Sequence, residues 1–111
     1  MTIQYKSEVF DLTDTNLTTV LTVATSAVAI VKTVQASHMD SSNVDVDLYL
    51  KKSGGSNVEI GHAQLNKSMT NMVVNTLNLE AGDVIKMQAS AANEITGAVS
   101  YALIDRSQEN G

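Results

Sequence analysis

Hydrophobic and polar residues alternate with a period of two along most of this chain. Within residues 43–51 the aliphatic side chains occupy every second position, at Val44, Val46, Leu48 and Leu50. A pleated strand places two alternating sets on opposite faces, whereas a helix would scatter both sets around its circumference. The pattern therefore predicts a strand with one apolar face and one polar face.

The next segment predicts that this strand belongs to a hairpin. Residues 53–57 read SGGSN, a glycine-centred reversal, and the alternation then resumes over 58–65. Two alternating segments joined by a short turn that contains glycine are typical of a β-hairpin. Regular alternation would place Val58, Ile60, His62 and Gln64 on one face of the second strand.

Similar segments recur along the chain at intervals of about ten to fifteen residues, as in sandwiches and jelly rolls. Strands are expected over 16–23, 28–37, 69–79, 84–90 and 98–105. No segment has a convincing helical period. The sequence therefore predicts an all-β fold, a single-domain antiparallel β-sandwich of the jelly-roll type with about seven or eight strands.

The expected domain covers the whole sequence, residues 1–111. Residues 1–12 would form an N-terminal arm or an edge strand, and 105–111 a polar C-terminal tail. The chain has no proline, a residue that sheet proteins often use to protect exposed edges. We therefore expect neighbouring subunits to cover the edges of this sheet.

Composition narrows the class of protein. Of the 111 residues, 43% are hydrophobic and only 17% are charged, which argues against a disordered chain. The net charge of −5 would repel the phosphates of a nucleic acid, so no nucleic-acid partner is expected. Cysteine is absent, which excludes a disulfide framework and a thiol nucleophile.

Neither a membrane partner nor an export signal is expected. The N-terminal sequence MTIQYKSEVFDLTD lacks the apolar core of a signal peptide. The most apolar stretch, 20–34, is interrupted by threonines, a serine and Lys32, and a membrane helix needs roughly 20 predominantly apolar residues. The sequence therefore predicts synthesis in the cytoplasm without a signal peptide.

Asp45 and Asp47 are the first candidates for chemistry, because their carboxylates share the polar face of a predicted strand. With Asn43 they offer oxygen ligands of the kind that calcium accepts. A calcium loop of the EF-hand type, however, needs glycine where Leu48 stands. A single strand face also lacks the cleft and the opposed carboxylates of a glycosidase. A solvated strand face is the favoured interpretation.

The remaining candidates do not assemble a catalytic site. His38 and His62 are far apart in sequence, and no serine lies in a nucleophile-elbow motif. The sequence LEAGDV at 79–84 predicts a turn that leads into a buried strand, because a phosphate loop needs more glycines and a lysine. We therefore expect no enzyme, no catalytic residues, no metal and no cofactor.

Apolar residues on both faces of segment 69–74 make it a candidate subunit interface. Methionine packs adaptably at interfaces, and neither face of this segment is cleanly polar. A central strand buried on both sides is the open alternative. The candidate interface residues are Met69, Met72, Val73 and Val74, together with Tyr49 on the polar face of segment 43–51.

Three motifs resemble a group of small structural proteins of tailed bacteriophages, frequent in marine and cyanobacterial phages. They are TVATSAVAIVKTVQAS, DSSNVDVDLYL and LEAGDVIKMQASAAN, and the resemblance extends from Asp11 to Ile104. This chain has Ala24 where the group usually has proline, which would loosen the turn at that position.

The resemblance implies a non-enzymatic, self-associating protein of the virion, made in the host cytoplasm. It would decorate or cement the capsid as a homo-oligomer, with a trimer as the first expectation, and contact the major capsid or tail protein. One alternative is a tail, neck or fibre module. The other is a glycan- or receptor-binding sandwich, which an aromatic content of 4% disfavours because sugars usually stack on aromatic rings.

Overall fold

The computed structural model describes residues 2–38, 43–66, 70–74 and 76–105, with 70–74 described for the backbone only. All regular secondary structure in these ranges is strand. The nine strands are β1 Thr2–Leu12, β2 Thr18–Thr22, β3 Ala27–His38, β4 Val44–Lys51, β5 Asn57–Leu65, β6 Thr70–Val74, β7 Leu77–Leu79, β8 Val84–Ala89 and β9 Ile95–Asp105. These ranges contain no helix that could cross a membrane.

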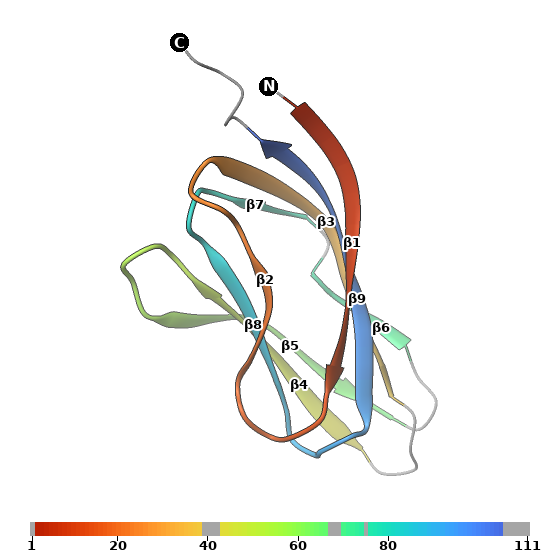
Figure 1. Cartoon of the computed structure of the whole chain (residues 1–111). Helices are drawn as coiled ribbons and strands as arrows, with labels where there is room; N and C mark the ends of the chain where they lie inside the picture. The colour runs from red at the N-terminus through yellow and green to blue at the C-terminus, as the bar shows by residue number, and fades with distance from the viewer. Residues whose placement is uncertain (1, 39–42, 67–69, 75, 106–111) are drawn as a thin grey trace.

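The strands form two sheets that pack face to face (Figure 1). One sheet has the order β1-β9-β3-β6, with β7 also paired to β3, and the other has the order β2-β8-β4-β5. Every pair is antiparallel. The pairing is nested along the chain. The outermost pair is β1–β9, followed inward by β2–β8, then by β3 with β6 and β7, and finally by β4–β5. This is the arrangement of a jelly roll, and it confirms the predicted fold class.

The structure divides one expected strand into two. Segment 69–79 contains β6 and β7, which both pair with β3 at separate places along its length. Among the described residues β6 lies at the end of its sheet, whereas the open alternative placed this segment in a central strand. The burial of its two faces lies outside the described residues. The last strand, β9, begins at Ile95 rather than at residue 98, so Gly97 lies inside the sheet.

The core lies between the two sheets and follows the alternation of the sequence. In β4 the apolar set Val44, Val46 and Leu48 is fully buried, while Asp45 and Asp47 lie on the outer face and are half-buried. The confirmed alternation fixes the register, because a slip by one residue would turn the carboxylates into the core. The largest fully buried side chains are Leu12, Leu48, Leu65, Leu79, Ile85, Met87 and Ile95.

The first strand, β1, is an edge strand, one of the two forms expected for the N-terminal residues. It pairs with β9 through eleven consecutive residues, from Thr2 opposite Asp105 to Leu12 opposite Ile95, without a register shift. Its other edge has no partner strand among the described residues. Figure 1 shows β1 along one side of the molecule.

Candidate functional site

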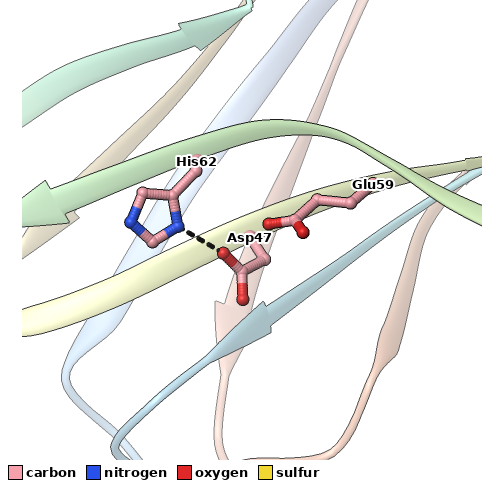
Figure 2. Close-up of side chains that lie close together, drawn as sticks. All are labelled: Asp47, Glu59 and His62. Atoms are coloured by element: carbon pink, nitrogen blue, oxygen red, sulfur yellow. Dashed lines mark hydrogen bonds and ion pairs between the residues drawn. The ribbon is translucent and has the colours of Figure 1, made fainter.

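Three side chains gather on the outer face of the sheet β2-β8-β4-β5. Asp47 comes from β4, and Glu59 and His62 come from β5. One ligand atom from each residue lies within 4.8 Å of the others. Figure 2 shows His62 and Glu59 on either side of Asp47, both pointing toward its carboxylate. We call this group the acidic–histidine cluster.

A β-bulge brings the cluster together. From Val44 to Leu48 the pairs of β4 and β5 are regular, with Asp47 opposite His62, but Tyr49 is opposite Glu59 rather than Ile60. Ile60 is therefore the extra residue of a bulge, which lets Glu59 and His62 share one face. The expectation of regular alternation in β5 is wrong for this reason, and without the bulge His62 would lie opposite core-facing Val46.

Asp47 is the centre of the cluster. Its Oδ1 lies 2.5 Å from Nδ1 of His62, which makes an ion pair when the imidazole is protonated. The hydrogen bond to Asp47 raises the pKa of His62, and the charges of Asp47, Asp45 and Glu59 add to this effect against the cost of desolvation. The pKa of Glu59 is also raised, first by its hydrogen bond with Asp47 and then by repulsion from that carboxylate.

The cluster has the donors to hold either a shared proton or a cation. One imidazole nitrogen and one oxygen from each carboxylate are ligand types that Zn²⁺ and similar ions accept. Glu59 and His62 are exposed and only Asp47 is half-buried, so the position is open to water. The geometry is that of a surface site for a proton or an ion, without the enclosure that acid–base catalysis uses.

The imidazole of His62 is expected to titrate above its ordinary pKa of 6.5 in nuclear magnetic resonance spectra. The stabilisation from its pairing with Asp47 is complete below pH 6.5 and is lost as the pH rises through the raised pKa of the folded state. Asp47→Asn should bring the titration back toward 6.5, whereas Asp45→Asn, which removes only a more distant charge, should change it less. Equal effects of the two variants would contradict this assignment.

The other predicted candidates are not part of the cluster. The backbone of Asp45 bonds Ser90, with its amide donating to Ser90 Oγ at 2.9 Å. His38 follows the strand expected over 28–37, where a loop would begin, but it is the last residue of β3 and is buried. Its Nδ1 lies 3.4 Å from the carbonyl oxygen of Glu94. His38 in β3 and His62 in β5 belong to different sheets, so they do not form one site.

The predicted interface residues are only partly covered by the structure. Met69 lies outside the described residues, and the side chains of Met72, Val73 and Val74 in β6 lie outside them too. Tyr49 is half-buried on the outer face of the opposite sheet, where it pairs with Glu59. Partial burial and the charges of Glu59 and Asp47 raise the pKa of its phenol.

The predicted turn before β8 is confirmed, and it contains a buried acid that the sequence did not single out. Gly82 has a φ of 82°, a conformation that favours glycine, and the Asp83 side chain beside it is 1% exposed. Asp83 Oδ2 accepts hydrogen bonds from Lys52 Nζ at 2.5 Å and from the Glu80 amide at 2.8 Å. Asp83 therefore ties this turn to the β4–β5 hairpin.

A patch of apolar side chains on the outer face of the sheet β1-β9-β3-β6 was also missed. Ile3, Tyr5, Val9 and Ile30 are all exposed, with Tyr5 at 78% and Val9 at 84%. Lys32 Nζ lies 5.2 Å from the centre of the Tyr5 ring, a cation–π contact across the face. Exposed apolar side chains on one face of a sheet make that face a candidate contact surface. We call these four residues the outer apolar patch.

No family model and no curated protein matches this chain. Solved structures do match. One is a chain of the capsid of Helicobacter pylori bacteriophage KHP30, with a TM-score of 0.60 and 10% identity over 96% of this chain and 90% of that chain. What it shares with this protein is the fold.

Two further structures have the same fold. A chain from Bacillus endospore appendages, described as disulfide-linked pili, has a TM-score of 0.57 and 10% identity over 96% of this chain and 90% of that chain. The infectious bursal disease virus VP2 subviral particle has a TM-score of 0.52 and 9% identity over 96% of this chain and 34% of that chain. The resemblance to tailed-phage proteins is not tested by likenesses at such low identity.

Proposed function

We propose that this protein is a non-enzymatic structural component of a virus particle that works by association with itself and with other virion proteins. The observation that carries the proposal is the outer apolar patch on a jelly roll, a fold that also builds the capsid chains of two of the matched viruses. Patches of this kind are buried when subunits meet.

The finer proposal is a protein that decorates or cements the capsid of a tailed bacteriophage. The three motifs that resemble the marine and cyanobacterial phage group support it. We further propose a trimer, as cyclic symmetry allows, with the major capsid protein as the other contact. Segment 69–74, with Met69, Met72, Val73 and Val74, and Tyr49 on the opposite sheet remain proposed contact residues. A tail, neck or fibre module is the alternative.

Cryo-electron microscopy of purified particles, with the copy number of this protein measured by quantitative mass spectrometry, tests the proposal. A decoration protein is expected in a fixed ratio to the major capsid protein and at symmetric positions on the head. A tail or neck module is expected in a small multiple of three or six copies per particle, as the cyclic symmetry of such structures requires. Absence of the protein from purified particles would overturn the virion role.

A further inference from the structure

One edge of β1 has no partner strand among the described residues. Its residues Thr2–Val9 are exposed on both faces, and the β1–β9 ladder runs without a bulge. Sheet proteins usually protect such an edge with proline, a bulge or a covering segment, because its unpaired backbone groups are a template for another strand. Within the described part of the chain, β1 has none of these.

The central residues of β1, from Tyr5 to Val9, are complementary to themselves in one antiparallel register. If two copies of β1 run antiparallel with Ser7 opposite Ser7, then Lys6 of each copy lies opposite Glu8 of the other. Tyr5 then lies opposite Val9. Directly opposed residues of an antiparallel pair share a face, and opposite charges or apolar groups in these positions attract. We propose that two copies of this chain pair through β1 in this register, about a two-fold axis at Ser7.

The faces of β1 agree with this pairing. Phe10 and Leu12 turn toward the core, so Lys6 and Glu8 lie on the inner face. Both line a hollow of about 350 Å³ between β1 and β2. Tyr101, buried in β9, donates its hydroxyl to Glu8 Oε1 at 3.2 Å, which holds that carboxylate in place. Tyr5 and Val9 lie on the outer face, where pairing would extend the outer apolar patch across both copies.

Lys6 and Glu8 have opposite charges, which distinguishes them from the inward charges that keep other strands from pairing with an edge. An inward charge on an edge strand usually opposes the addition of another strand. Here Lys6 and Glu8 have opposite signs and flank the symmetry axis at equal distance, so each meets its complement. The two-fold axis repeats every contact, which gives two Lys6–Glu8 pairs and two Tyr5–Val9 pairs at one interface.

This inference rests on the proposed role as a self-associating protein. It identifies β1 as the surface of one contact between copies of the chain. A two-fold contact through β1 uses a different surface from segment 69–74 and Tyr49, so it adds to the proposed three-fold association and does not replace it. It can be tested on the purified full-length chain, without particles. Its failure would leave the virion role intact, and absence of the protein from particles would leave the β1 contact intact.

Charge exchange between positions 6 and 8 is the decisive experiment. Lys6→Glu and Glu8→Lys each place like charges opposite one another, and each should weaken self-association about tenfold in sedimentation equilibrium, as altered surface charge contacts predict. The double variant Lys6→Glu/Glu8→Lys restores opposite charges and should associate as the unchanged protein does. An equimolar mixture of the two single variants should also associate, because the two acidic side chains of one variant then face the two basic side chains of the other.

Lys51→Glu, at the end of β4 in the other sheet, makes the same charge change away from the interface and is the matched control. It should leave the association constant unchanged, and circular dichroism should show that all variants are folded. The proposal is overturned if the unchanged protein does not associate, if the single variants associate normally, or if neither the double variant nor the mixture recovers. Recovery in the mixture cannot come from restored folding, since each chain in it still carries its single change.

Discussion

Gly97→Ala is expected to destabilise the protein by about 3 kcal/mol or more, at the upper end of what overpacking costs. Gly97 lies in β9, between Phe10 of β1 and Ala36 of β3. A Cβ atom at this position would overlap both the backbone oxygen of Gln35 and the ring of Phe10. The ring can move, but the carbonyl belongs to the β3–β9 ladder, so relief requires the two strands to separate.

Urea unfolding followed by circular dichroism measures this effect, and two variants make it specific. Gly54→Ala replaces a glycine with a φ of 77° that has no atom within 4 Å of the added Cβ. It should cost only about 1–2 kcal/mol, the strain of a left-handed backbone. Phe10→Leu combined with Gly97→Ala should recover little, because the Gln35 carbonyl remains. A Gly97→Ala protein as stable as Gly54→Ala would contradict the assigned close approach.

Asp83→Ala is expected to cost about 2–3 kcal/mol, because a buried carboxylate with charge-assisted hydrogen bonds is lost and its donors stay behind. The amide of Glu80 and the ammonium of Lys52 both donate to Oδ2, and the Ser53 amide approaches Oδ1 at 3.4 Å. Glu80 supplies the other carboxylate on Lys52, but its side chain is 77% exposed. Glu80→Gln should therefore change stability little.

The pH dependence of stability gives a second test of Asp83. Burial by itself would raise the pKa of Asp83, but the hydrogen bonds from Lys52 and the Glu80 amide, with the charge of Lys52, outweigh burial and lower it. The stabilisation is therefore complete above pH 3.8, the ordinary pKa of the group, and is lost as the pH falls through the lower pKa of the folded state. Asp83→Ala should remove this part of the acid transition, and an unchanged acid transition would contradict the assignment.

The alternation of the sequence was sufficient to predict the fold, because every second side chain is buried throughout β8 and in β4 from Val44 to Leu48. The burial of Val44, Val46 and Leu48 in the core could be predicted without knowing which strands pair with β4. The break between β6 and β7 was not visible, because both halves are apolar and β3 is long enough to pair with each in turn. The alternation of hydrophobic and polar residues therefore gives no signal for the break between β6 and β7.

The acidic–histidine cluster could not be predicted for a different reason. Its three residues are close only because Ile60 is an extra residue in β5, and the bulge has no clear signal in the sequence. The hairpin itself was predicted correctly, but a regular register would have placed Gly61 opposite Asp47. The outer apolar patch was missed because Ile3, Tyr5, Val9 and Ile30 come from two strands whose adjacency to β9 only the topology supplies.

The nested pairing of the strands also sets an order for folding. β4 and β5 are joined by a short turn and can pair as soon as both exist, whereas β1 pairs only with β9, and the loop that this closes contains almost the entire described chain. Contacts between segments so distant in sequence form late, since the entropy of loop closure opposes them. Of the described strands, β1 is synthesised first and finds its intramolecular partner last. The strand with the free edge in the folded protein is thus also the one exposed longest to other nascent copies.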